Sequence, residues 1–469
     1  MALVSRKLSG RDIIQQKNNK YLPYEKRIVF LYFTKCKYLF DQTMIRKIAF
    51  LISALLLFSY PFAAQETVLN SKLLKADKLF INRHYEQAVE VYLKYLEKYP
   101  KDYYAERQAA LCYNKLNKPD DAIDHWPLVV ESSDATEKDY LEYGKSLLAN
   151  NRIPEAKKIF KVLNKSADRS MAAWGKMYTN PAALYIDSGS VRVVEVKGIN
   201  SELPESSPIF FKERMYYVSD MMRSPRTFYT LNDEETQHIG GALKKDSLNL
   251  FPSIFIEKLH QLPISGPFCF SPDGGTLYFT RAVSSREMKT KSSETYFKFQ
   301  IYTLNMSTID NLQPEIKPFR YNTPDHDFMH PTISKDGKHL FFASDMKGSA
   351  GGKDIFMCEW TSNGWAAPVN AGAQVNSPGN EIFPSFTEDN ILYFSSDHIP
   401  GLGGLDIFFA PLSLTKEKVF DNAENAGATM NSRFDDFGVF IYKDGKCGYL
   451  TSNRKNNTDD DIYYFYEIK

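Results

Sequence analysis

The sequence predicts an α+β multidomain fold in which an N-terminal α-solenoid precedes an all-β propeller. Two periods in the 469-residue chain indicate this order. Residues 67–180 repeat small and aromatic residues every 34 positions, which is typical of stacked helix pairs. Residues 185–469 repeat a strand-and-turn pattern five times, which is typical of propeller blades.

The first part of the chain is expected to direct export. Ile48–Tyr60 is an uncharged apolar run that follows Arg46-Lys47 and precedes small residues. This order is that of a secretory signal peptide, and the run is too short to span a bilayer comfortably. We therefore expect residues 44–65 to be the signal and residues 1–43 to be an over-long reading of the gene or an extra extension. The mature protein should be periplasmic or outer-membrane associated, without a transmembrane span.

The helical repeats are marked by small residues at two positions and an aromatic residue at a third. Small residues let two helices cross closely, and the ring fills the next gap. The three series are Ala76, Ala110 and Gly144; Ala88, Ala122 and Ala156; and Tyr92, Trp126 and Phe160. We interpret them as core. Trp174 falls near where a fourth repeat would begin, so residues 168–178 are expected to form a capping helix.

The first helix of each pair should line a concave face. By the pattern, that face exposes Tyr104, Arg107, Asn114, Lys138 and Lys145. The surface is polar and leans basic, so we predict that these five residues bind protein. A solvated face without a function is the alternative.

The propeller repeat is clearest in two copies, His330–Asp345 and Phe383–Asp397. Each is followed by a glycine-rich loop and by Asp-Ile-Phe, at 354–356 and 406–408. Three weaker copies contain Pro208, Pro267 and Gly438. The five anchors, with Pro331 and Pro384 between them, are 59, 64, 53 and 54 residues apart.

Each copy is expected to form a small antiparallel sheet. Asp-Gly at 273–274, 336–337 and 444–445 is hairpin chemistry, because glycine supplies a positive φ. Five copies predict five blades, and six blades with one degenerate is the alternative. Residues 191–196 precede the first copy and are expected to supply the outer strand of the last blade, which would close the ring.

These repeats resemble the WD-like β-propeller repeat of the TolB type, and the 34-residue period resembles the tetratricopeptide repeat. In tandem they are similar to the front half of OmpA-family envelope proteins linked to type IX secretion and gliding motility. The resemblance implies an exported scaffold that binds envelope proteins or peptide segments. Such relatives often continue into a peptidoglycan-binding OmpA-like domain. The sequence to Lys469 shows none, so peptidoglycan contact is in doubt.

Composition argues against several classes of function. Without residues 1–65, the chain has 47 Lys and Arg against 54 Asp and Glu, which gives no electrostatic reason to bind nucleic acid. The four remaining cysteines, Cys112, Cys269, Cys358 and Cys447, form no Cys-x-x-Cys motif, so neither a zinc site nor a redox pair is indicated. No cofactor is expected.

No motif predicts catalysis. There is no Gly-x-Ser-x-Gly turn, and Gly348–Lys353 lacks the spacing of a phosphate-binding loop. His326 and His330 are four residues apart, but in an expected loop, so we interpret them as structural rather than metal-binding. We therefore predict no catalytic, cofactor or metal residues.

Two further patterns recur between blades and are interpreted as architecture. Asp461 aligns with Asp354 and Asp406, and each is expected to cap backbone N–H groups before a third strand. Asn-Ser recurs before a strand at 200–201, 376–377 and 431–432.

The expected function is thus a non-enzymatic scaffold. The alternative is a carbohydrate-binding or ligand-binding propeller, or a propeller enzyme, which needs polar groups that converge at the channel. The candidates for that role are Arg320, Asp325, Asp327, His330 and Glu381. The segment 282–300 interrupts blade two and is either a functional or a disordered loop. The partner, the oligomeric state, and the choice between periplasm and cell surface stay open.

Overall fold

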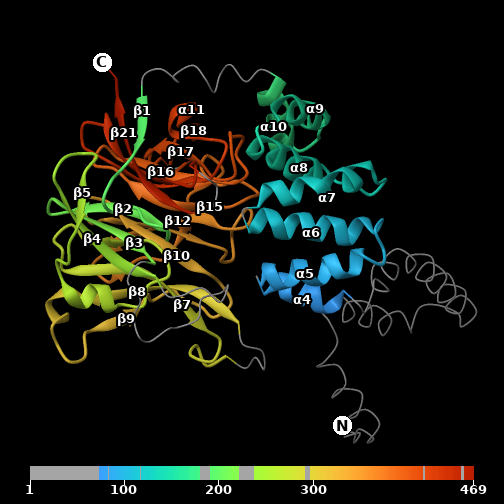
Figure 1. Cartoon of the computed structure of the whole chain (residues 1–469). Coiled ribbons are helices and arrows are strands. Elements are labelled where there is room, and N and C mark those ends of the chain that lie inside the picture. The colour runs from blue at the N-terminus through green and yellow to red at the C-terminus, as the bar shows by residue number, and fades with distance from the viewer. Residues whose placement is uncertain are drawn as a thin grey trace, which may run out of the picture. The chain divides into compact units, whose positions relative to one another are not determined.

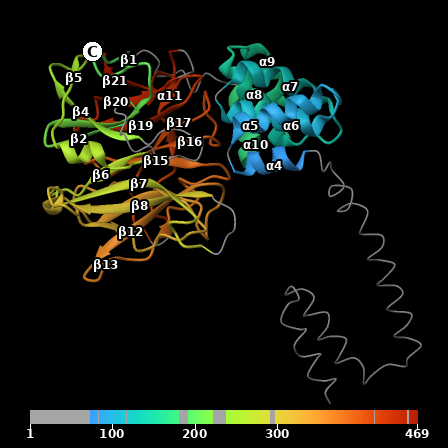
Figure 2. The ribbon, with the colours of Figure 1, turned by 60° about the horizontal axis from the view of Figure 1, so that its bottom comes forward.

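The computed structural model describes residues 73–82, 84–116, 118–179, 191–220, 237–290, 296–415, 418–455 and 459–468. The extension and signal peptide expected over residues 1–65 lie outside the described residues, as do residues 67–72 and 185–190 at the predicted domain edges. The described helices and strands belong to one compact unit, Leu73–Lys469. Helices α4 to α10 come first in the chain and the strands follow, with the short helix α11 (Gly427–Met430) between β18 and β19 (Figures 1 and 2).

The helical part consists of three antiparallel pairs and a final helix. The pairs are α4 (Leu74–Ile81) with α5 (Tyr85–Leu96), α6 (Tyr103–Lys115) with α7 (Pro119–Glu131), and α8 (Glu137–Ala149) with α9 (Ile153–Leu163); α10 (Arg169–Thr179) follows. Helices α6 and α8 begin at side-chain caps. Asp102 accepts hydrogen bonds from two N–H groups of the first turn of α6, and Thr136 forms a capping box with Asp139 at α8.

The residues that recur every 34 positions are the ones that pack in the helical core. The aromatic series Tyr92, Trp126 and Phe160 is fully buried. Gly144 must be small, because a Cβ there would lie 2.5 Å from the ring of Phe160. The interpretation of these residues as core is confirmed.

Helix α10 caps the solenoid, as predicted. Asp168 begins it by accepting hydrogen bonds from the N–H groups of the next residues. Trp174 and Tyr178 stack on Phe160 with ring centroids 5.5 Å and 4.4 Å away, and both rings are nearly fully buried. These rings close the apolar end that a last repeat would otherwise expose.

The strands form five antiparallel sheets, which are the blades. Blade one is β2 (Glu205–Phe211), β3 (Arg214–Ser219), β4 (His238–Lys244) and β5 (Leu250–Pro252); blade two is β6 (Phe268–Phe270), β7 (Thr276–Ser284), β8 (Phe297–Asn305) and β9 (Ile316–Pro318). Blade three is β10 (Phe328–Ile333), β11 (His339–Ser344) and β12 (Asp354–Thr361), whose outer edge pairs with β13 (Gly364–Trp365) and β14 (Val369–Asn370). Blade four is β15 (Glu381–Phe386), β16 (Ile391–Ser396), β17 (Asp406–Pro411) and β18 (Glu424–Asn425).

Blade five closes the ring with a strand from the other end of the propeller. It contains β19 (Asp436–Ile441), β20 (Cys447–Ser452) and β21 (Asp461–Glu467), and its outer strand is β1 (Val191–Glu195). The register runs from Val191 opposite Glu467 to Glu195 opposite Tyr463. The predicted closing strand is therefore confirmed, and the propeller has five blades rather than six.

The hairpin turns follow the predicted chemistry. Gly274, Gly337 and Gly445 have φ of 75°, 72° and 68°. The first copy lacks Asp-Gly, and there Lys212 and Glu213 take positive φ values of 50° and 62° instead. A weak sequence match thus still forms the same turn.

The recurring proline marks a bulge in the innermost strand. Ser207, His330 and Phe383, each directly before a proline anchor, have φ of 54°, 56° and 54°, and Gly438 has 57°. The strand register shifts at each of these points. The repeated position is therefore a bent backbone site that the blades share.

The segment 282–300 differs from the loop that was predicted. Its first residues extend β7 and its last residues begin β8, so that Ala282 pairs with Phe299 and Ser284 with Phe297. The tip includes residues 291–295, which lie outside the described residues. Aromatic residues at 296–299 alternate with polar ones, and this alternation was the signal for a strand.

Candidate functional site

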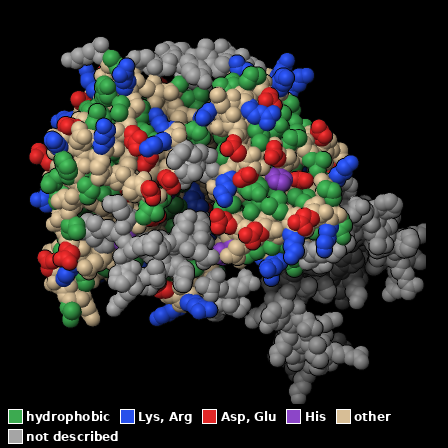
Figure 3. All heavy atoms as spheres, in the orientation of Figure 1, with side chains coloured by type: hydrophobic (Ala, Val, Ile, Leu, Met, Phe, Trp, Pro, Cys, Tyr) green, Lys and Arg blue, Asp and Glu red, His purple; other side chains and the backbone are tan. Residues whose placement is uncertain are grey.

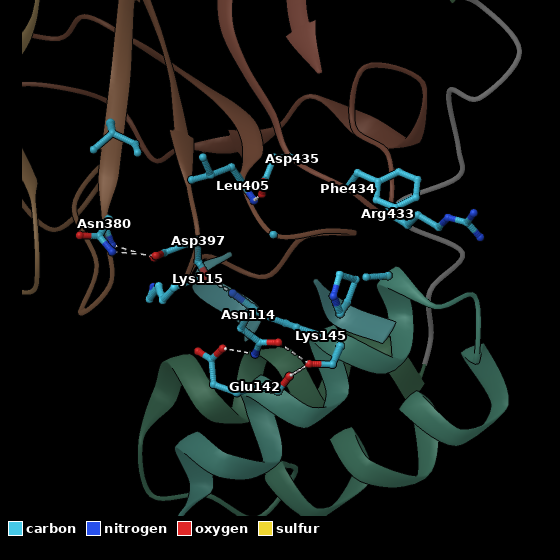
Figure 4. Close-up of a pocket in the computed structure, with 15 residues that line it drawn as sticks. Asn114, Lys115, Glu142, Lys145, Asn380, Asp397, Leu405, Arg433, Phe434 and Asp435 are labelled. Atoms are coloured by element: carbon cyan, nitrogen blue, oxygen red, sulfur yellow. Dashed lines mark hydrogen bonds between the residues drawn. The ribbon is translucent and has the colours of Figure 1, made fainter. Parts of the chain in front are cut away.

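A polar hollow of about 330 Å³ is the candidate binding site. On one side it is lined mainly by α6 and α8, and on the other by the segments where β15 and β19 begin and by the loop between β16 and β17 (Figure 4). Its lining includes Lys115 and Glu142 from the helices and Asp397, Arg433 and Asp435 from the propeller.

The helical wall is held by a hydrogen-bond network. The Nδ2 group of Asn114 donates to Glu142 at 3.2 Å, and the hydroxyl of Ser146 donates to Asn114 Oδ1 at 2.9 Å. The buried indole N–H of Trp126 donates to Ser146 at 3.1 Å. A core aromatic residue therefore fixes the polar side chains that face the hollow. The bond between Asn114 and Glu142 is drawn in Figure 4.

The propeller wall is held by two carboxylates. Asp397 accepts from the N–H and the Nδ2 group of Asn380 at 2.8 Å and 2.7 Å. Asp435 accepts from the N–H of Leu405 at 2.7 Å. Gly404 must be glycine here, because a Cβ would lie 2.2 Å from Asp435 Oδ1.

Charges of both signs meet in the hollow. Burial alone would raise the pKa of Asp397, but the ammonium groups of Lys145 and Lys115 hold it below its ordinary value. Burial raises the pKa of Asp435, and the neighbouring Asp436 adds to the effect. On the face that Figure 3 shows, basic and acidic side chains are likewise interspersed. Such a site suits a ligand with several polar groups rather than a simple ion.

The five residues predicted to bind protein are not all in one place. Asn114 and Lys145 line the hollow. The hydroxyl of Tyr104 donates to Asp77 at 3.0 Å, which ties α6 to α4. Lys138 is exposed outside the hollow. Their role in binding stays a prediction.

Arg107 stabilises the packing of two helices at the same face. Its guanidinium group donates to Asp139 at 2.8 Å and to the backbone oxygen of Asp134 at 3.1 Å, and so links α6 to the start of α8. Sequence reasoning counted it as a surface cation because its partner lies 32 residues away.

Sequence reasoning missed the propeller half of the site. Asp397 ends a repeated block, so it was counted as architecture. Arg433 and Asp435 lie just before a strand in a segment whose Asn-Ser pattern also repeats. No sequence signal places them opposite Lys115, because the contact depends on how the solenoid packs on the blades.

The repeated asparagines and aspartates are architectural, as predicted. Asn376 and Asn431 each bond both backbone groups of one residue in the preceding blade, Ile355 or Ile407, at 2.7–3.0 Å. Asp406 accepts from two N–H groups of the loop before β17 at 2.9 Å, and Asp354 does the same before β12. The loop before Asp461 lies partly outside the described residues, so the capping role of Asp461 stays a prediction.

Buried acids begin several inner strands. Glu205 and Glu381 are fully buried, and burial raises the pKa of each to about 7. Both accept hydrogen bonds from the serine four residues earlier. Asp327 is equally buried and pairs with Lys353 at 3.2 Å.

Of the five candidates for a catalytic channel, two are exposed and three, Asp327, His330 and Glu381, are buried. Arg320 and Asp325 are exposed, and Arg320 donates to the backbone of the outer hairpin of blade three. His330 is buried, stacks on Phe383 at 4.1 Å and accepts the N–H of that residue at 3.1 Å. Burial lowers the pKa of His330 to about 3, so it stays neutral.

His326 does not join His330. It lies 3.5 Å from Asp345, whereas His330 points to the neighbouring blade. Over the described ranges, no group of three or more His, Cys, Asp or Glu side chains is arranged to hold a metal ion. In the same part of the chain, no helix combines the length and the apolarity that crossing a membrane requires.

Comparison with known proteins supports the repeat assignment over a small part of the chain. No known family model matches the sequence. A stretch of 74 residues, 16% of this chain, is 39% identical to a TPR repeat-containing protein of Methanocaldococcus jannaschii, and the match spans only 22% of that protein.

Solved propeller structures are only distantly similar. TolB from Acinetobacter baumannii is 14% identical, with 65% of this chain and 71% of that chain covered and a TM-score of 0.32. The α-L-arabinofuranosidase of Lactobacillus brevis is 14% identical, with 57% and 91% covered and a TM-score of 0.35. A β-fructofuranosidase of Bombyx mori is 10% identical, with 63% and 66% covered and a TM-score of 0.35. These values are too low to carry a conclusion about function.

Proposed function

We propose that this protein is a non-enzymatic adaptor that binds other proteins through its helical repeats and its propeller. The observation that supports it most is the polar hollow, which takes one wall from each module. Its carboxylates Asp397 and Asp435 are engaged by the fold's own N–H groups, so they shape the surface rather than act as free acids or bases. Helical repeats and propellers both offer extended surfaces of this kind.

The finer proposal is an adaptor of the cell envelope, in the periplasm or at the outer membrane. It is supported by the signal-like segment at 44–65 and by the resemblance to envelope proteins of type IX secretion and gliding motility. The partners would be envelope proteins or their peptide segments.

The test is affinity purification of the full chain from its own cells after crosslinking. The variant is Lys115→Glu with Arg433→Glu, which reverses two charges that line the hollow. The matched control is Lys338→Glu with Lys446→Glu, which makes the same charge change at lysines 69% and 64% exposed on blade hairpins. We expect a specific envelope protein to be retained by the control and lost by the variant. Equal recovery with both would contradict binding at the hollow.

A second candidate is a ligand-binding propeller, and Asp460 favours it. Burial raises the pKa of Asp460 to about 7, and the carboxylates of Asp435, Asp459 and Asp220 raise it further. Acids with strongly shifted pKa values cluster at functional sites. Binding to a glycan array that Asp460→Asn abolishes would support this alternative; an array without binding would remove it.

A further inference from the structure

The last two helices that line the solenoid face hold a loop of the propeller by its backbone. The blade-four loop, residues 397–405, connects β16 to β17. The indole N–H of Trp174 donates to the carbonyl oxygen of His398 at 2.7 Å, and the hydroxyl of Tyr178 donates to that of Gly401 at 2.7 Å. The ammonium group of Lys145 donates to the carbonyl oxygen of Asp397. Three side chains of α8 and α10 thus bind three carbonyls of one short segment.

Hydrogen bonds within the propeller fix the conformation of the loop, and its three carbonyl groups point away from blade four. The N–H groups of His398 and Ile399 donate to Ser396 Oγ at 3.1 Å and 3.0 Å. Those of Leu402 and Gly403 donate to Asp406 at 2.9 Å. The donors of the loop therefore point into blade four, and its acceptors at 397, 398 and 401 are left for the helices.

The three donor side chains of the helices also contact one another. Lys145 Nζ lies 5.0 Å from the ring centroid of Trp174, which is a cation–π contact. The rings of Trp174 and Tyr178 are nearly parallel, with an interplanar angle of 4°. Because the rings are fixed by the core and by Phe160, their polar ends are presented in a constant arrangement.

We propose that the blade-four loop is an intramolecular ligand of the solenoid, and that it latches the α8–α10 end of the predicted protein-binding face closed. This rests on the proposed function as a protein-binding adaptor. A tethered loop competes at a high effective concentration. A partner segment that reaches α8 and α10 must therefore displace it. Because Asp397 and Leu405 of the loop also line the hollow, a ligand of the hollow binds while the latch is closed. Lys145, which was predicted to contact a partner, binds the blade-four loop when the latch is closed.

The latch can be tested by chemical modification of lysines in the full-length protein. Acetylation by an N-hydroxysuccinimide ester is followed by mass spectrometry, and the rate at Lys145 is compared with that at Lys138. Both lysines lie on α8, but Lys138 is exposed and Lys145 is engaged by the loop. We expect Lys145 to react far more slowly than Lys138 in the unchanged protein.

Two variants weaken the latch: Tyr178→Phe removes only the hydroxyl, and Trp174→Phe removes the indole N–H together with its five-membered ring. A neutral hydrogen bond changes an equilibrium by about fivefold, so each variant should speed acetylation of Lys145 about fivefold and the pair about twenty-five-fold. The matched control is Tyr140→Phe, which removes a hydroxyl that donates to the backbone oxygen of Val130 at 3.0 Å within the helices. It should leave the rate at Lys145 unchanged.

Two results would overturn the latch. One is a rate at Lys145 equal to that at Lys138 in the unchanged protein. The other is a slow rate at Lys145 that Tyr178→Phe leaves as it was. If Trp174→Phe fails to fold, Tyr178→Phe alone decides the matter. Neither result depends on a partner, so failure of the latch is distinct from failure of the adaptor function, which the purification tests.

Discussion

Replacement of Asn376 by alanine tests whether a recurring residue is architecture or a site. Asn376 is 6% exposed and precedes blade four. Its Oδ1 accepts the N–H of Ile355 at 2.8 Å, and its Nδ2 group donates to the carbonyl of Ile355 at 3.0 Å. Ile355 is fully buried in blade three. The side chain thus extends the edge pairing that β14 makes with β12 at Phe356 and Met357.

Asn376→Ala leaves the N–H of Ile355 buried without a partner, whereas the carbonyl of Ile355 still accepts the N–H of Ala371 at 2.9 Å. Each unsatisfied buried group costs about 1–3 kcal/mol. We therefore expect a loss of about 1–3 kcal/mol in the free energy of unfolding, read as a fall in Tm of roughly 2–4 °C for each kcal/mol. Thermal unfolding followed by circular dichroism measures it.

The control is Asn363→Ala, at an exposed hairpin residue, which should change stability by less than about 0.5 kcal/mol. Asn431→Ala, at the equivalent position before blade five, should match Asn376→Ala. If Asn376→Ala unfolds like the control, the recurring asparagine is not structural, and a binding role must be considered again.

Two other changes test the buried acids and the solenoid core. Burial raises the pKa of Glu381 to about 7, so the folded protein holds a proton that the unfolded chain releases above its ordinary pKa near 4.5, and stability falls as pH rises from about 4.5 to 7. Glu381→Gln should remove up to about 3 kcal/mol of that fall, measured by urea unfolding at pH 5 and pH 8; an unchanged pH dependence would refute the assignment. Gly144→Ala should lower stability by about 1 kcal/mol despite the better helix propensity of alanine, because the new Cβ meets the ring of Phe160. A rise in Tm would show that the helices can separate at that point.

The fold was largely predictable because each signal repeats. The 34-residue aromatic series that ends at Phe160 repeats one packing requirement in each helical pair, and turn glycines such as Gly337 repeat one turn in several blades. A repeat with a weak match can therefore be assigned from the stronger ones. The closing strand at 191–195 followed from the need to complete the last blade. The strand ends within segment 282–300 were not predicted, because its charged residues were interpreted as a loop.

The candidate site was only half predictable, for the opposite reason. Its helical residues Asn114 and Lys145 come from the repeat pattern, but Asp397 and Asp435 belong to loops that the pattern assigns to architecture. Their meeting is a contact between modules, and no period in the sequence encodes it. Likewise, Trp174 was recognised as core from its ring, whereas its N–H bond to His398 depends on the packing of α10 against blade four.

The central claim is that a protein partner binds at the hollow, and site-specific photo-crosslinking tests it most directly. A benzoylphenylalanine at position 115, which lines the hollow, is compared with one at position 338 on an exposed hairpin, in the native cells. We predict that one envelope protein is crosslinked at position 115 and not at position 338. No adduct at 115, or the same set of adducts at both positions, would contradict the account.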